Sequence, residues 1–471
     1  MSTTGPQDAP THWRGILRHL GPGLIITACI VGSGELIATP LVGAEYGFSL
    51  LWFIIGGCMI KVLVQVELGR FAISKGMTTL EAMNTIPGPR LVVSWLVWCW
   101  LFMFVGILFQ LGGIVGGVGK VVAELGWFAG FGGTGIFTID RLIALAVSAA
   151  TVAILASGKY KPVELFSVIM VVLFVVATLF ALGSLQWSPA MEAHSISWAD
   201  IREGFQFRLP GDFSKAFAAF GIIGVGASEL IYYPYWCLEK GYARNVGTPN
   251  PTNVWYLRTQ GWLRVMRIDA CVSMVVYTGA TVAFFLLGAA LLHGTTGVSN
   301  DTMIADLSKM YAPLGKAGLT IFLMGAFVVL FSTMVTASAS NARLLADGLV
   351  LFQLKKPRNE KERAKLLSQC CIIVPLVCAG MYFFVGAPVS LVLVGGVAQA
   401  LMLPPLAGAA LYFRYKQTDK PLQPSKVWTA LLWVSAIAMA SVGLFMGKEQ
   451  IEKYLDKRNS SAQPAQESRT K

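Results

Sequence analysis

Long apolar runs dominate the chain, and short polar connections separate them. A run of about twenty apolar residues is long enough to cross a bilayer as an α-helix. On this basis we predict about eleven spans, at residues 20–47, 49–74, 91–119, 139–157, 163–186, 214–239, 267–293, 315–341, 369–387, 389–413 and 426–446. The pattern indicates an all-α, multi-pass integral membrane protein in contact with the lipid bilayer.

The composition excludes a soluble protein. Hydrophobic residues make up 55% of the chain and charged residues 13%, with a mean hydropathy of +0.63, whereas a soluble chain carries about a quarter charged residues. The eight cysteines show no metal-binding spacing, and the four histidines lie at span ends or in loops. We therefore expect no enzyme and no cofactor.

Positive charge is distributed unevenly between the two ends of the predicted spans. If the N-terminus is cytoplasmic, 23 of the 37 lysines and arginines lie on the cytoplasmic side, seven in the outside loops, six in the C-terminal tail, and Lys61 within a span. This bias follows the positive-inside rule and explains most of the net charge of +12 without nucleic-acid binding. We predict a bacterial-type plasma (inner) membrane protein with a cytoplasmic N-terminus and an external C-terminus.

Two apolar runs are interrupted by the same pattern of small residues and a carboxylate. Residues 31–40 read VGSGELIATP, and residues 225–234, 194 positions later, read VGASELIYYP. A carboxylate inside a span is costly and normally faces a cavity or a partner. Small residues before it let the helix unwind, and unwound backbone needs water, protein or an ion beside it. Because paired interruptions mark the binding sites of secondary transporters, Glu35 and Glu229 are the predicted centre of function.

The two motifs also define the organisation of the chain. They open two sets of five spans on opposite sides of the membrane, which is the pattern of an inverted repeat. We predict the following units: a cytoplasmic segment at 1–19, a transporter domain at 20–446 made of repeat one (about 20–186), repeat two (about 214–413) and an extra helix at 426–446, and a polar, disordered tail at 447–471.

Two further features concern connections and packing. The longest cytoplasmic connections are expected at 241–261 and 350–366. The glycines between Gly112 and Gly119 have overlapping GxxxG spacings, which allow two helices to approach closely. We expect these glycines to serve helix packing.

Several short segments resemble one family of membrane transporters. The entry to the first span reads GPGL at 21–24, EYGFSLLW follows at 45–52, and RID opens the seventh predicted span at 267–269. In these segments the chain resembles the Nramp (natural resistance-associated macrophage protein) family of divalent metal transporters. The resemblance implies a LeuT-type 5+5 inverted repeat with broken spans one and six, and passage of a metal cation between them.

The sequence departs from the family pattern where the chemistry lies. The family's metal-binding D-P-G-N is replaced by Gly32-Ser33-Gly34-Glu35, and its M-P-H is replaced by Ser228-Glu229-Leu230. Ser228 thus stands at the methionine position, although a one-residue shift places Ala227 there. Leu230 stands at the proton-linked histidine, and uncharged residues 109–112 stand at the acidic positions of the third span. The divergence implies transport without proton coupling, closest in character to the Nramp-related magnesium transporters.

The candidate site is built from oxygen ligands. Two carboxylates with carbonyls from two broken helices suit hard divalent cations such as Mg²⁺ or Mn²⁺. Without a cation two nearby carboxylates cannot both ionise cheaply, so one of them is an alternative proton carrier. The candidate ion-binding residues are Gly32, Ser33, Glu35, Val225, Ala227, Ser228, Glu229 and Gln399, of which Glu35, Glu229 and Ser228 are the candidate metal ligands.

Lys61 and the aromatic residues at the end of the second motif and just after it leave alternatives open. Lys61 lies deep in the second span, where it pairs with a glutamate of the site, pairs with another group, or faces a water-filled vestibule. An amino-acid or organic-amine permease of the same fold is the alternative function, with an aromatic wall around an ammonium group. The residues of that wall are Tyr232, Tyr233, Tyr235 and Trp236. For these aromatic side chains we expect instead the more common role, an aromatic belt at the membrane interface.

Overall fold

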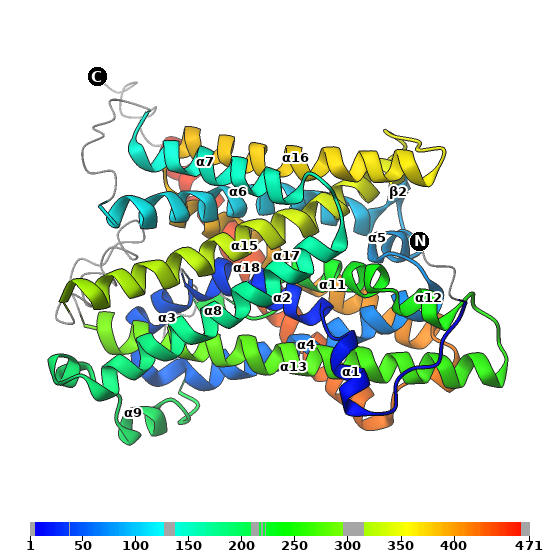
Figure 1. The fold of residues 1–471 in the computed structure, drawn as a ribbon, viewed down its shortest axis with the longest axis horizontal. Coiled ribbons are helices and arrows are strands. Elements are labelled where there is room, and N and C mark those ends of the chain that lie inside the picture. Colours follow the sequence, from blue (N-terminus) through cyan, green and yellow to red (C-terminus); the bar gives the residue numbers. More distant parts are fainter. Residues whose placement is uncertain are drawn as a thin grey trace.

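The computed structural model describes residues 5–36, 38–126, 137–208, 216–217, 220–221, 223–294 and 315–462. These residues form a bundle of long helices that run along the longest axis of the molecule (Figure 1). The described strands are β1 (Arg90–Leu91) and β2 (Val93–Ser94), which pair antiparallel directly before helix α6 (Trp95–Glu124). The predicted all-α architecture is confirmed.

Helices or broken helices occupy the predicted spans. The first repeat contains α2 (Pro22–Ile30), η1 (Val31–Glu35), α3 (Ala38–Tyr46), η2 (Gly47–Leu50), α4 (Leu51–Lys75), α5 (Thr79–Asn84), α6 (Trp95–Glu124), α7 (Ile139–Leu155) and α8 (Tyr160–Trp187). The second contains α11 (Ala227–Lys240), α12 (Tyr242–Val246), α13 (Asn253–Leu292), α15 (Gly315–Leu351), α16 (Glu360–Val385) and α17 (Pro388–Tyr412). The remaining elements are α1 (Trp13–His19), η3 (Pro189–His194), α9 (Trp198–Glu203), η5 (Phe413–Gln417), η6 (Lys420–Leu422) and α18 (Lys426–Ala462).

Eight helical segments of the described chain are long and apolar enough to cross a membrane. One of these segments joins α3 to α4. The other predicted spans correspond to α2 with η1, to α7 with 17 residues, and to α11 with 14 residues and the irregular backbone before it. The broken helices therefore occur in the first span of each repeat, as predicted.

Several helices extend beyond the predicted ends of the apolar runs. The connections expected at 241–261 and 350–366 are mostly helical, because α13 starts at Asn253 and α16 at Glu360. Side-chain caps start these polar ends, with Thr252 accepting from the Trp255 N–H at 3.3 Å and Asn359 accepting from the Glu362 N–H at 2.9 Å.

The predicted tail begins as helix. Helix α18 continues to Ala462, so residues 447–462 are not the disordered segment that their polarity favoured. Two i,i+4 ion pairs, Lys448–Glu452 at 3.6 Å and Lys453–Glu449 at 2.5 Å, stabilise this polar extension. The rest of the predicted tail, 463–471, lies outside the described residues.

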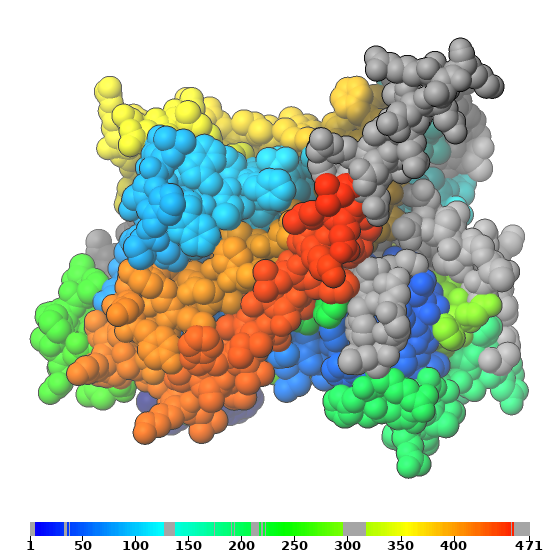
Figure 2. Space-filling model, turned by 180° about the vertical axis from the view of Figure 1, so that it is seen from behind, coloured from blue at the N-terminus to red at the C-terminus, as the bar shows by residue number. Residues whose placement is uncertain are grey.

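Glycines on α6 allow the close packing that was predicted from their spacing. A Cβ added at Gly113 would lie 2.3 Å from the Pro388 carbonyl oxygen, and one added at Gly116 would lie 2.2 Å from the Tyr382 ring. The α6 backbone therefore packs directly against the α17 backbone at Gly113 and against the Tyr382 ring of α16 at Gly116. Seen from behind the view of Figure 1, α18 lies across the surface from orange to red (Figure 2).

The connections rich in lysine and arginine gather at one end of the bundle. The N-terminal segment with α1, together with α5 and α12, lies at the right of Figure 1, whereas α9 lies at the opposite end. We refer to the end with α1, α5 and α12 as the basic end. The orientation predicted from the positive-inside rule makes this end cytoplasmic.

Candidate functional site

The first break is a single π-helical turn. Helix α2 ends at Ile30, and η1 covers residues 31–35 before α3 begins at Ala38. The Gly32 N–H donates to Thr333 Oγ1 at 2.7 Å, and the same hydroxyl donates to the Ala28 carbonyl at 2.8 Å. A side chain at Gly32 would collide with Thr333, so only glycine permits this bond. Such π-turns are frequent at functional sites.

The second break is irregular backbone that leads into α11. Residues 223–226 are not helical, and Gly224 has a φ of +62°, which favours glycine. A Cβ there would also lie 2.9 Å from Cys58 Sγ. Helix α11 then starts at Ala227 and places Glu229 in its first turn, where the helix dipole favours a carboxylate. The same motif thus adopts two different backbone conformations in the two repeats.

Glu35 joins the two breaks. Its side chain is fully buried, and Oε1 accepts hydrogen bonds from the Gly224 N–H at 3.0 Å and from the Thr281 hydroxyl at 2.8 Å. Its second oxygen, Oε2, is buried without a hydrogen-bond partner. A buried carboxylate oxygen of this kind is costly unless a proton or a cation satisfies it.

Glu229 belongs to a separate polar cluster. Its Oε2 accepts from the Ser228 hydroxyl and its Oε1 from the Tyr232 hydroxyl, both at 2.7 Å. The side-chain oxygen of Gln399, on α17, accepts from the Ser228 N–H and hydroxyl, both at 3.0 Å. The amide of Gln399 donates to Gln110 Oε1 on α6 at 2.9 Å. The cluster therefore connects the start of α11 to α17 and, through Gln399, to α6.

Lys61 lies close to the second break. Its ammonium is completely buried and donates to the carbonyls of Phe220 at 2.6 Å and Ile223 at 2.5 Å, above the Phe220 ring at 4.5 Å. It also lies within electrostatic reach of Glu35 and Glu229, although no direct bond joins it to either. Of the three alternatives, the structure shows pairing with another group: the unwound backbone of span six.

The predicted site residues are thus only partly brought together. Ser228, Glu229 and Gln399 share hydrogen bonds, and Glu35 reaches the second break through Gly224. Val225 is buried within that break, Ala227 is buried at the first position of α11, and Ser33 belongs to the π-turn. In the described part of the chain, no group of three His, Cys, Asp or Glu side chains is arranged to hold a metal. The two carboxylates have separate partners in this conformation.

The aromatic residues at the end of the second motif and just after it do not form an interfacial belt. Tyr232, Tyr233 and Trp236 are fully buried, and Tyr235 is 6% exposed. Tyr233 donates to Asp269 Oδ2 at 3.0 Å, and Trp236 donates to the Ser340 hydroxyl at 3.0 Å. The expectation of a belt was wrong because each of these polar tips finds a partner inside the bundle.

Sequence reasoning missed Asp269 as a structural anchor. It is 2% exposed and accepts from the N–H groups of Gly21 at 3.0 Å and Gly23 at 2.7 Å, at the start of α2. With Tyr233 it ties the first halves of spans one and seven to α11. Thr281 and Gln110 were missed in the same way. Their common signal in the sequence was a polar side chain inside a predicted span.

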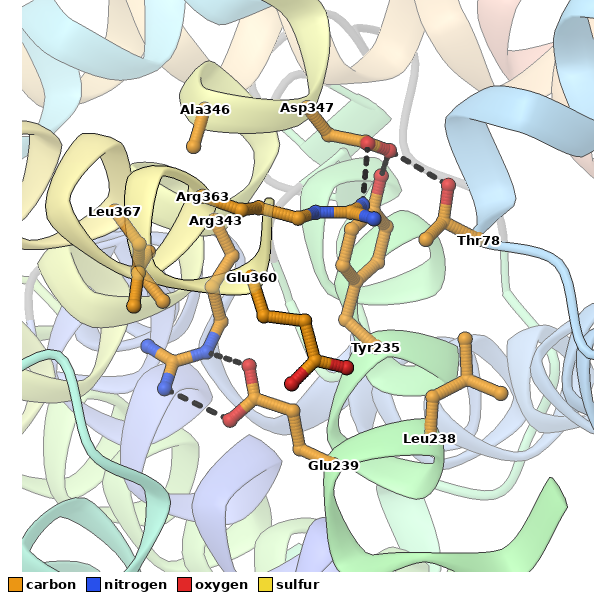
Figure 3. A pocket seen from close by; sticks show the side chains of 11 residues that line it. Thr78, Tyr235, Leu238, Glu239, Arg343, Ala346, Asp347, Glu360, Arg363 and Leu367 are labelled. Atoms are coloured by element: carbon orange, nitrogen blue, oxygen red, sulfur yellow. Dashed lines mark hydrogen bonds and ion pairs between the residues drawn. The ribbon is translucent and has the colours of Figure 1, made fainter. Parts of the chain in front are cut away.

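A cavity of about 370 Å³ lies near the C-terminal end of α11. Figure 3 shows a bidentate pair between Arg343 and Glu239, with N–O distances of 2.6 and 2.9 Å. Asp347 accepts from Tyr235 at 2.5 Å and also from Thr78 and Arg363, so α11, α15, α16 and the start of α5 are held together. These bonds close the basic end of the bundle around α11.

Comparison with known proteins places this arrangement in a family. The model for natural resistance-associated macrophage protein-like (Nramp) proteins matches residues 23–447. A divalent metal cation transporter, MntH, from Deinococcus radiodurans is 26% identical over 359 residues, which cover 74% of this chain and 71% of that protein. The MntH of Pectobacterium carotovorum is 21% identical over 341 residues, 71% of this chain and 73% of that protein.

Two solved structures share the fold. A manganese transporter from Eremococcus coleocola superimposes with a TM-score of 0.71 at 14% identity, covering 96% of this chain and 91% of that chain. The nucleobase-cation-symport-1 family transporter Mhp1 gives a TM-score of 0.60 at 15% identity, covering 95% and 97%. These matches confirm the predicted LeuT-type fold. The chain belongs to the Nramp-like family of multi-pass membrane transporters and is not an enzyme.

Proposed function

We propose that this protein moves a divalent metal cation of the Mg²⁺ or Mn²⁺ type across the membrane by alternating access, at a site between the broken spans one and six. Family membership supports the proposal, as do the relatives named divalent metal cation transporters and the structural neighbour named a manganese transporter. The observation that carries it is the buried Oε2 of Glu35, which has no hydrogen-bond partner beside unwound backbone.

The surrounding ligands are all oxygens. Glu229 and the Ser228 hydroxyl lie at the start of α11, where the side-chain oxygen of Gln399 on α17 contacts Ser228. Glu35 reaches the backbone just before α11. Carboxylate, hydroxyl and amide oxygens prefer hard cations. We infer that the bound cation draws Glu229 away from Ser228 and Tyr232 toward Glu35. This movement couples binding to a shift of α11 against α2.

Uptake into proteoliposomes tests the proposed substrate class. We expect Mg²⁺ or Mn²⁺ to enter, and Glu35→Gln to abolish their uptake. Ca²⁺ and a mixture of amino acids are the comparison substrates. Uptake of an amino acid or organic amine without any metal uptake would instead establish the permease alternative. That alternative lacks an open aromatic wall in this structure, because the four aromatic side chains are buried and hydrogen-bonded.

Metal uptake is expected to proceed without proton transfer. Leu230, at the family's histidine position, is fully buried and has no titratable group, and Gln110 in the third span is an uncharged partner of Gln399. A pH dye inside the vesicles should therefore stay constant while metal enters at zero membrane potential, clamped with K⁺ and valinomycin. A dye response that scales with metal flux and disappears in Glu35→Gln would show proton coupling.

A further inference from the structure

A surface groove lies between α13 and the start of α18, at the basic end of the bundle. Its volume is about 540 Å³. The residues that line it are Arg264, Arg267, Ile268, Cys271, Val272, Val275, Val276 and Trp428. The two arginines stand at one end, and apolar side chains continue from them along α13.

The spacing places charge and apolar surface on one face of α13. Arg267, Cys271 and Val275 recur every fourth residue, so they form a continuous stripe. All three are exposed, and Val275 is 68% exposed although it is apolar. A stripe that passes from guanidinium groups to valines matches the passage from lipid headgroups to acyl chains.

The positive charge at the groove is not neutralised by the protein. Arg70, Arg264 and the carboxylate of Glu67 lie within electrostatic reach of Arg267. Glu67 is already used, because it accepts from Arg70 at 3.2 Å and from the Trp428 indole at 2.7 Å. Among the described residues no ion pair forms with Arg264 or Arg267. Two exposed guanidinium groups therefore remain available to an anion.

We propose that this groove binds one anionic glycerophospholipid of the phosphatidylglycerol type from the leaflet at the basic end. The phosphate lies between Arg264 and Arg267, since guanidinium groups bind phosphate oxygens through paired hydrogen bonds. One acyl chain follows Cys271, Val272 and Val275. Basic pockets between membrane helices recognise anionic headgroups in this way. The lipid bridges α13 to α18, the helix that lies outside the two repeats.

Native mass spectrometry of the detergent-purified full-length protein tests the site. The probes are dioleoyl phosphatidylglycerol, dioleoyl phosphatidylcholine and inorganic phosphate. We expect the first phosphatidylglycerol to bind at least tenfold more tightly than phosphatidylcholine. The Arg264→Gln/Arg267→Gln protein should lose that preference. The matched control, Arg90→Gln/Arg258→Gln, removes two arginines of the same end outside the groove and should keep it.

Two further arms separate the acyl chain from the phosphate. Val275→Trp fills the groove without changing charge and should weaken phosphatidylglycerol binding several-fold, while the thermal midpoint shows that the variant is folded. Inorganic phosphate should not displace the lipid. Equal loss of preference in the control pair, or displacement by phosphate alone, would overturn the assignment.

Discussion

Replacing Glu35 by glutamine is expected to lower the affinity for Mg²⁺ or Mn²⁺ at least tenfold. Oε1 of Glu35 accepts from Gly224 and Thr281, so the amide oxygen of the glutamine takes that position and its NH₂ group replaces Oε2. The NH₂ group of the glutamine, which does not coordinate a cation, then faces the position proposed for the metal. Losing one desolvated carboxylate costs roughly 2–5 kcal/mol on the scale of buried charge pairs, and a tenfold change corresponds to about 1.4 kcal/mol.

Glu229→Gln should act in the same direction with a smaller effect. Its two oxygens accept from Ser228 and Tyr232, and an amide oxygen keeps one of these bonds. If both carboxylates bind one cation, the double variant should be little worse than Glu35→Gln, because the two effects act on one site.

Calorimetry of cation binding on folded wild type and variants measures both effects. Glu360→Gln is the matched control, since Glu360 is an exposed glutamate that lines the cavity of Figure 3, away from both breaks. Wild-type affinity in both single glutamine variants at positions 35 and 229 would remove the metal-site assignment.

Lys61→Met is expected to produce two opposite changes, in stability and in affinity. The substitution leaves the carbonyls of Phe220 and Ile223 without their donor, and each unsatisfied buried group costs about 1–3 kcal/mol. The thermal midpoint should therefore fall. The same change removes a positive charge that lies within electrostatic reach of both glutamates.

Divalent cations should bind the Lys61→Met protein at least tenfold more tightly. A divalent ion within about 8 Å of an ammonium is repelled by several kcal/mol at an effective dielectric constant of about 20. Lys75→Gln is the control, because Lys75 lies on the same helix but pairs with Asp419 at the basic end. Thermal melts with and without metal, together with calorimetry, measure both changes. Weaker metal binding in the Lys61→Met protein would show that the ammonium organises the site rather than opposing the cation.

The hydrogen bonds and ion pairs at the basic end hold the structure in a conformation that is closed on that side. Asp269 holds the start of α2, and the Arg343–Glu239 pair with the bonds of Asp347 holds α11 against α15 and α16. These contacts fix the halves of spans one and six that face the basic end. In the proposed alternating-access cycle, opening toward that side breaks these contacts, so they set part of the free-energy difference between the two proposed access states.

The sequence alone determined the architecture because membrane spans are encoded by local composition. The length of each apolar run, the bias of lysine and arginine, and the two copies of one motif predicted the helices, the inverted repeat and its broken spans. Burial of backbone in lipid leaves helices as the available solution, so little depended on long-range contacts. The ends of α13, α16 and α18 were missed because caps and ion pairs, not hydropathy, extend them.

Only the tertiary structure decided how the buried charges are satisfied. The sequence placed Glu35, Glu229 and Lys61 inside spans, but not which partners they have. Partner choice depends on which helices pack together, and that packing sets the Lys61 ammonium on the carbonyls of span six. The same packing gives Oε1 of Glu35 two hydrogen-bond donors and leaves Oε2 without one. Hydrogen-bond geometry between distant segments is a property of the folded bundle, so no local pattern predicts it.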